Sequence, residues 1–492
     1  MESKQIWLRP RLFITNPAKP PIIVWLKRRI LTLTNKIMKT QKYICLYVAC
    51  CAFLLFGCEK YLDQKSNDSL VVPKTLKDIQ GILDDAATIN IRNTPSYNEH
   101  SSDDFFMLPA SYNSFPIPYK PVYVWKPTVY THQNDYAQGY TAIFNCNLSL
   151  DLLAKVEREG GNAKTWDNIK GSALFFRSYY FLMLNSQFGL AYDETGSKTE
   201  LGIPLRLDAE FAKPSFRATV AEVYQQVMKD LESSIQLLPD YPEHVMRPSK
   251  GAALALLSRC HLYMRNYELA LKYAEAALLL NNKLINYNGD PDLLALTSNL
   301  PFKKFNKETI WYAEMSYGFG LNSPPGARID TLLYSSYNVN DLRRTAYFRA
   351  FAPYQQFKGS YSASATYYFS GLATDELYLT KAECRAYLDD VTGALNDLNF
   401  LLKTRWRSTV SYLPITAINR LDALNKIRTE RRKELLYRGL RWEDIKRYNK
   451  EGANITLKRI VNGEVFTLEP NSKAYALSLP DDIIRISGMP QN

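Results

Sequence analysis

The residues best suited to covalent chemistry are few and scattered in this sequence. It holds four histidines, which are His100, His132, His244 and His261. None of them belongs to a His-Glu-x-x-His zinc site, and the chain has neither a Gly-x-Ser-x-Gly elbow nor a Gly-rich phosphate loop. These patterns argue against serine, metal and nucleotide chemistry. A glycosidase needs only two distant carboxylates, which leave no local signature among 49 acidic residues, so that alternative stays open.

Aromatic side chains offer non-covalent binding instead, and they gather in two loop-rich regions, 90–132 and 282–370. Rings on loops can stack on the apolar faces of a flat ligand while neighbouring polar groups supply hydrogen bonds. Each ring could equally belong to the core. The predicted ligand contacts are Tyr97, Tyr112, Tyr123 and Trp125 in the first region, Trp311, Tyr317 and Tyr337 in the second, with Asp103, Asp104 and Arg328 as polar partners.

The adjacent carboxylates Asp103 and Asp104 also raise the alternatives of acid–base catalysis and calcium binding. Calcium takes six or more oxygen ligands, and no such cluster is readable around this pair. Ser101 to Asp104 has the spacing of a capping box, with Asp in place of Glu or Gln. A structural cap or a loop hydrogen bond is therefore the favoured interpretation, and we expect neither a metal nor a cofactor.

A hydrophobic leader ends at Cys58. The run from Tyr43 to Gly57 follows a basic cluster at 38–42 and is too short for a bilayer-spanning helix, which needs about 20 apolar residues. Cleavage before Cys58 would free a thiol for acylation, so we predict a lipid-attachment cysteine, the alternative being an uncleaved membrane anchor. Residues 1–37 would make an unusually long basic leader, which suggests that Met38 is the true start.

The basic composition does not point to nucleic acid. The chain has a net charge of +12, but residues 1–57 hold ten of the 61 basic residues and one of the 49 acidic residues. The rest of the chain therefore carries 51 basic against 48 acidic groups. Nucleic-acid binding needs a clustered basic face, so we expect no such partner. Cys146, Cys260 and Cys384 show neither disulfide nor metal spacing and are predicted to be buried free thiols.

Apolar residues at helical spacing dominate the remaining sequence, most clearly over 250–281. The segments that begin at Cys260 and Cys384 match at Cys, Tyr, Ala and Leu with equal spacing, which indicates an internal repeat. Each resembles a tetratricopeptide helix pair, where small residues such as Ala270 and Ala394 let antiparallel helices approach closely. Further helices are expected over 136–156, 166–188 and 219–238.

These patterns predict a mostly helical scaffold of tetratricopeptide-like pairs that carries long loop-rich insertions. The predicted organisation is a leader over 1–57, a tether and N-terminal segment over 58–89, an aromatic loop with helical repeats over 90–281, a loop-rich insertion over 282–370, and a C-terminal region with the last helical repeat over 371–492.

The segment from Glu430 to Arg447 resembles the closing signature of the SusD/RagB family of outer-membrane nutrient-uptake lipoproteins. Similarity extends over nearly all of the chain after the leader, in the family's order, through segments 58–63, 102–104, 140–147, 171–177, 202–205 and 398–399. Arg438 departs from the acid that relatives usually carry before the glycine, which puts a local ion pair in doubt. Read as one helix, the signature predicts Glu434 facing Arg438 and a helix end at Gly439. A second pair, Glu443 with Arg447, and a buried Trp442 are also expected.

The resemblance implies a non-catalytic protein that faces the medium, held to the outer membrane by lipid. Such proteins cap a TonB-dependent transporter of the SusC type and enclose oligosaccharide, or sometimes peptide, against it. Acyl chains anchor a protein stably while leaving its body free to move. A peptide-capturing relative, a surface glycoside hydrolase and a repeat scaffold that binds only proteins remain alternatives.

Overall fold

The computed structural model describes residues 73–130, 134–324 and 326–492, and the described residues after Val72 form one compact unit. The predicted lipid-attachment Cys58 lies outside the described residues. Among the described helices, none combines the length and the apolar character needed to cross a membrane. The fold is mostly helical, as the apolar spacing predicts.

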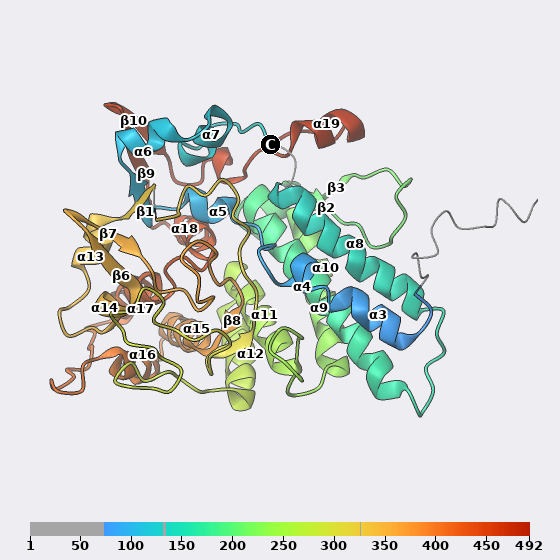
Figure 1. Ribbon diagram of the computed structural model, residues 1–492, viewed down its shortest axis with the longest axis horizontal. Coiled ribbons are helices and arrows are strands. Elements are labelled where there is room, and N and C mark those ends of the chain that lie inside the picture. The colour runs from blue at the N-terminus through green and yellow to red at the C-terminus, as the bar shows by residue number, and fades with distance from the viewer. Residues whose placement is uncertain (1–72, 131–133, 325) are drawn as a thin grey trace, which may run out of the picture. The chain divides into compact units, whose positions relative to one another are not determined.

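Helix α9, Ala163–Phe188, is the central element of the N-terminal half. It is buried almost continuously from Gly171 to Phe188, because α8, Asp135–Leu153, and α10, Val220–Leu237, pack along it. Helix α3, Leu76–Leu83, lies against α8 and α9, and Figure 1 shows these helices side by side. A capping box of Thr219 and Glu222 fixes the start of α10.

Two helix pairs confirm the predicted internal repeat. The first is α11, Lys250–Tyr263, with α12, Tyr267–Leu280, and the second is α15, Thr374–Tyr387, with α16, Val391–Arg405. Helix α12 also packs on α15, and the rings of Tyr267 and Tyr387 stack between the pairs with centroids 3.8 Å apart. Ala270 and Ala394 are fully buried where the helices meet. The tetratricopeptide-like scaffold is therefore present.

The three cysteines of the described part are buried and free, as predicted. Cys260 and Cys384 occupy matching positions in α11 and α15, where each has no exposed surface. Burial raises the pKa of the Cys146 thiol to about 12. These thiols are packing residues.

Short elements fill the two aromatic regions, because prolines interrupt the first and no helical spacing runs through the second. The first follows α4 (Ala86–Ile89) and holds α5 (Tyr97–Ser101), β1 (Phe105–Met107), α6 (Pro109–Ser114), η1 (Ile117–Tyr119) and α7 (Lys120–Tyr123). The second holds β4 (Thr309–Trp311), β5 (Ala327–Ile329), α13 (Thr331–Ser335), α14 (Arg343–Tyr347), β6 (Phe348–Phe351) and β7 (Tyr354–Phe357), followed by β8 (Leu372–Ala373).

One antiparallel strand pair joins the two aromatic regions, and other pairs lie outside the first region. β1 pairs with β5, so that Phe106 lies opposite Arg328, while β6 pairs with β7 and β4 with β8. Two further pairs are β2 (Leu201–Pro204) with β3 (Arg217–Thr219) and β9 (Leu457–Val461) with β10 (Glu464–Leu468). The remaining short helices are η2 (Gly196–Lys198), η3 (Lys473–Tyr475) and α19 (Asp481–Ser487).

The closing signature forms two helices, and the first ends before Gly439, where the sequence predicted the helix end. Helix α17, Arg420–Glu434, ends before the turn that leads to α18, Arg441–Lys450. Gly439 therefore does not end a helix. It has a φ of 75° in that turn, and its N–H donates to Glu99 at 2.8 Å. Trp442 is fully buried, as expected.

The two ion pairs predicted within the signature are also wrong. Glu434 faces Arg343 and Arg405, while Arg438 reaches Asp375 at 2.6 Å. Arg447 binds Glu383 and Asp444. The turn between the helices separates Glu434 from Arg438. Glu443 and Arg447 keep their four-residue spacing within α18, but Glu443 pairs with Lys446 instead.

Candidate functional site

Most of the predicted ligand contacts in the first aromatic region belong to the core. Tyr97 is buried, and its ring stacks on Phe319 with centroids 4.5 Å apart. Tyr123 and Trp125 are also buried, and the indole N–H of Trp125 donates to the Ser101 carbonyl at 2.9 Å. A buried ring has no free face for a ligand. The half-buried Tyr112 has the Lys120 ammonium 5.3 Å from its ring centroid.

Asp103 and Asp104 are bound to arginines of the closing signature. Arg441 makes a two-pronged contact with Asp103, at 2.7 and 2.9 Å, and Arg432 binds Asp104 at 2.8 Å. Burial opposes ionisation of Asp103, but the guanidinium groups of Arg432 and Arg441 hold its pKa below the usual range. This pair fastens the first aromatic region to α17 and α18. It does not form the capping box that its spacing suggested.

Trp311, Tyr337 and Arg328 of the second region are buried as well. The Trp311 indole donates to the Met246 carbonyl at 3.1 Å, and the Tyr337 hydroxyl donates to the Lys433 carbonyl at 2.7 Å. The rings of Trp311 and Tyr337 are therefore part of the core beneath the loop-rich insertion. Ligand contact by the predicted set stays a prediction, and Tyr317 is the member with the most accessible ring, at 45% exposure.

Tyr317 forms a small surface with two residues that the sequence did not single out. The ring of Tyr367 lies 6.0 Å from that of Tyr317, and the Arg92 guanidinium carbon lies 3.9 Å above the Tyr367 ring. Arg92 is exposed and Tyr367 is half-buried. We call Arg92, Tyr317 and Tyr367 the aromatic surface. It combines two ring faces with a guanidinium, the groups that stack on and hydrogen-bond to a sugar.

The backbone holds the Tyr317 ring in place. Gly320 has a φ of 66°, and a Cβ atom there would lie 2.4 Å from the Tyr317 ring. Beside it, Gly318 has a φ of 51° and a Cβ would meet Ser96 at 2.4 Å. Only glycine fits both positions, because each combines a left-handed backbone with close contact. The Tyr317 ring therefore packs directly against the backbone of Gly320.

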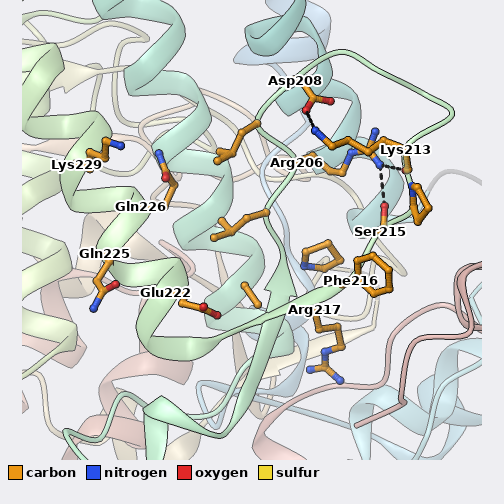
Figure 2. A pocket seen from close by; sticks show the side chains of 15 residues that line it. Arg206, Asp208, Lys213, Ser215, Phe216, Arg217, Glu222, Gln225, Gln226 and Lys229 are labelled. Carbon is orange, nitrogen blue, oxygen red and sulfur yellow. Dashed lines mark hydrogen bonds and ion pairs between the residues drawn. The ribbon is translucent and has the colours of Figure 1, made fainter.

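The loop between β2 and β3 creates a second concave region (Figure 2). A pocket of about 670 Å³ lies between this loop and one face of α10. Arg206 shapes the loop by donating to the Lys213 carbonyl at 2.6 Å and to the Ser215 hydroxyl at 3.0 Å. Asp208 pairs with Lys213 at 2.6 Å.

Nine of the 15 residues that line this pocket are polar or charged. Figure 2 shows Gln225, Gln226 and Lys229 projecting from α10, with the ring of Phe216 on the loop opposite. Phe216 is 75% exposed. With a single ring, the pocket offers less stacking surface than the aromatic surface does.

Over residues 73–130, 134–324 and 326–492, no three His, Cys, Asp or Glu side chains come together in a way that could hold a metal ion. Burial lowers the pKa of His100 to about 3, so this imidazole is neutral at physiological pH. The described groups best placed to contact a ligand are the side chains of the aromatic surface and of the pocket beside α10.

Comparison with protein-family models gives two matches. Residues 60–262 match the SusD-like model described as "Starch-binding associating with outer membrane", and residues 334–476 match the SusD/RagB model described as "SusD family". No curated protein matches the chain.

Solved structures share the fold. A SusD-like carbohydrate binding protein from Bacteroides vulgatus is 20% identical, with a TM-score of 0.62 over 84% of this chain and 97% of that chain. A SusD superfamily protein from Bacteroides thetaiotaomicron is 19% identical, with a TM-score of 0.68 over 85% of this chain and 99% of that chain. A SusD superfamily protein from Bacteroides fragilis is 19% identical, with a TM-score of 0.67 over 85% of this chain and 99% of that chain.

The two family matches lie in the same order as the motifs that suggested the family, and the second contains the closing signature. The chain belongs to the SusD/RagB family.

Proposed function

We propose that this protein is an outer-membrane lipoprotein that captures oligosaccharide and delivers it, uncleaved, to a TonB-dependent transporter of the SusC type. The observation that carries the proposal is the accessible Tyr317 ring, packed against Gly320 and beside Tyr367 and Arg92. Sugar rings have apolar faces that stack on such side chains, and their hydroxyl groups accept hydrogen bonds from a guanidinium.

The location and the partner rest on the family and on the leader. The family description associates its members with the outer membrane, and a similar structure is named as carbohydrate binding. In this proposal Cys58 carries the lipid. A tether of that kind leaves the aromatic surface free to close against a transporter.

Glycan binding is tested with the variant Tyr317→Ala. Screening against a glycan array and then titration calorimetry on the best ligand should show about a tenfold loss of affinity, since a ring face that contacts ligand is worth about 1 to 2 kcal/mol. Tyr241→Ala removes another exposed tyrosine, 66% accessible, and serves as the matched control. Equal affinities in both variants would remove Tyr317 from the site.

The screen also separates the alternatives. Retention of peptides in place of glycans would make the protein a peptide-capturing member of the family. New reducing ends in the glycan incubation would reveal a hydrolase.

Anchoring is tested with Cys58→Ser. Cells fed an alkyne-bearing fatty acid should label the native protein and not the variant, and the native protein should resist extraction from outer membranes without detergent. An unmodified, unprocessed amino terminus in the native protein would contradict the lipid anchor.

A further inference from the structure

The buried cations of this protein have unequal partners. Among residues 73–130, 134–324 and 326–492, twelve Lys and Arg residues are buried. Nine of them lie within 4 Å of a carboxylate, namely Arg177, Arg259, Arg343, Arg405, Arg431, Lys433, Arg438, Lys446 and Arg447. A buried charge is costly unless it is paired, so the exceptions are informative.

The exceptions are Arg328, Lys358 and Arg459. Arg459 has compensation of another kind, since its guanidinium carbon lies 3.6 Å from the centroid of the Tyr123 ring and the charge of Asp103 acts on it. No acidic charge of the described residues is found to act on Arg328 or Lys358, and both residues lie next to the β6–β7 hairpin.

Arg328 is held by neutral groups. Its guanidinium donates to the carbonyls of Pro324, at 3.2 Å, and Ala327, at 2.8 Å, and lies 4.0 Å from the Phe351 ring centroid. Its Nε is buried without a hydrogen-bond partner in the described part of the chain. Carbonyl oxygens satisfy N–H groups but leave the positive charge in place.

Lys358 and Arg349 extend this positive group. The Lys358 ammonium donates to the carbonyls of Leu296 and Ser298, each at 2.7 Å. Arg349, half-buried on β6, donates to the Gln356 side-chain oxygen at 3.1 Å, and the Gln356 amide in turn donates to the Pro324 carbonyl that also accepts from Arg328. A neutral hydrogen-bonded chain therefore links Arg349 to Arg328.

These cations adjoin the aromatic surface. Both groups meet at the loop that follows Tyr317. Tyr368, the residue after Tyr367, donates from its hydroxyl to the Asn322 carbonyl at 3.1 Å, and the Gln356 amide, which binds Arg349, donates to Pro324 in the same loop. The Arg92 guanidinium lies over the Tyr367 ring.

The carboxyl groups around the surface do little to cancel this charge. Burial raises the pKa of Glu99 to about 8, so this group is largely uncharged at neutral pH. Glu314 pairs with Lys304 at 2.9 Å. Asp135 is a further carboxyl group here: it accepts from the Ser316 hydroxyl at 2.5 Å, and burial raises its pKa to about 6. Arg92 lies over the Tyr367 ring and Arg349 donates to Gln356, and neither forms an ion pair with a described carboxylate.

We propose that the ligand of the aromatic surface is an anionic oligosaccharide, whose carboxylate or sulfate groups bind between Arg92 and Arg349. This inference rests on the proposed capture of glycan and specifies its class. Guanidinium groups bind carboxylate and sulfate through paired N–H groups, and low-dielectric surroundings strengthen the attraction. The buried Arg328 and Lys358 add positive potential behind the surface.

The test compares ligands that differ only in charge. Titration calorimetry would measure the affinity of the folded lipoprotein for tetragalacturonate and for its fully methyl-esterified form, with a heparin-derived tetrasaccharide as the sulfate arm. We expect at least tenfold tighter binding of one anionic ligand than of the neutral ester, with affinity falling as salt increases. The arm that binds identifies carboxylate or sulfate as the recognised group.

Variants locate the charge effect. Arg349→Gln and Arg92→Gln should each weaken binding of the anionic ligand about five- to tenfold and leave the melting temperature close to that of the native protein. Lys229→Gln, which removes a charge from the pocket in Figure 2, is the matched control and should change nothing.

Three outcomes would overturn the inference. Equal or tighter binding of neutral glycans, lost in Tyr317→Ala, would refute the anionic class and leave glycan capture intact. Equal affinities for Arg349→Gln, Arg92→Gln and Lys229→Gln would refute the assigned arginines. Absence of binding to every glycan would refute both this inference and the proposed function.

Discussion

Glu434 compensates two buried arginines at once. It accepts from Arg343 at 2.9 Å and from Arg405 at 2.8 Å, and Arg405 also binds Glu308. All four side chains are almost completely enclosed. The guanidinium groups lower the pKa of Glu434 against the effect of burial, so the network remains ionised. It ties α14, α16 and α17 to the strand region.

Replacing Glu434 by Gln should destabilise the protein by about 3 to 5 kcal/mol, because it leaves two buried guanidinium groups without full compensation. Urea unfolding followed by circular dichroism measures the loss. The control is Glu243→Gln, which breaks an exposed ion pair with Arg247 and should cost less than about 1 kcal/mol. Similar losses of unfolding free energy in both variants would show that the buried network stabilises the protein no more than an exposed ion pair does.

Glu99 should make the folded state less stable as the pH rises from about 4.5 to about 8. Burial, with Asp104 nearby, raises its pKa to about 8, whereas an exposed Glu titrates near pH 4.3. In that range the folded protein holds a proton that the unfolded chain has released, so the free energy of unfolding falls by up to about 1.4 kcal/mol per pH unit.

The measurement is urea unfolding of the native protein and of Glu99→Gln at several pH values. Asp375 and Asp135, with pKa values raised to about 7 and about 6, add slopes of the same sign in both proteins. The difference between the two curves isolates Glu99. Parallel curves would mean that this carboxyl titrates normally.

At the level of elements, the sequence predicted which segments form helices, but it did not predict where the helices of the closing signature end or which partners their charged side chains bind. The apolar spacing correctly indicated α8 to α12, α15 and α16, since burial of one helix face leaves a local periodic signal. In the closing signature, Gly439 signalled a break in the helix but not that the first helix already ends at Glu434. The charged residues of the signature have distant partners, such as Glu383 for Arg447, that sequence spacing does not reveal.

Two helical glycines should respond in opposite ways to a methyl group. A Cβ at Gly171 would lie 2.9 Å from Leu238 Cγ, where α9 meets the end of α10, whereas a Cβ at Gly81 in α3 would meet nothing within 4 Å. We expect Gly171→Ala to destabilise by about 1 to 3 kcal/mol and Gly81→Ala to stabilise by about 0.5 to 1 kcal/mol. Thermal unfolding of both variants checks this, and a gain from Gly171→Ala would contradict the tight crossing.

At the level of the whole molecule, the aromatic surface shows why the site was only partly predictable. The sequence indicated the right regions and included Tyr317, but it also selected rings that are buried, because ring type does not distinguish core from surface. Arg92 was missed. Its ring partner Tyr367 is remote in sequence, and a lone arginine in a loop gives no local signal.

The described part of the chain should survive a cut in the loop between β2 and β3. Phe211 in this loop is 83% exposed, while the β2–β3 pairing and the ion pair of Arg177 with Asp230 join the two sides of the cut. With a specific protease site inserted after Phe211, the cleaved protein should elute as one species in gel filtration and unfold in one transition. The uncut insertion variant is the control, and separation of the fragments without denaturant would show that the halves fold independently.

The burial of Cys146, Cys260 and Cys384 has a practical consequence. Because these sulfurs are enclosed and protonated at neutral pH, maleimide dyes should not react with them under native conditions. A single cysteine introduced beside the aromatic surface, in a form that begins after Cys58, could then carry a fluorophore with all three buried cysteines retained. Such a reporter would follow ligand arrival in real time in solution.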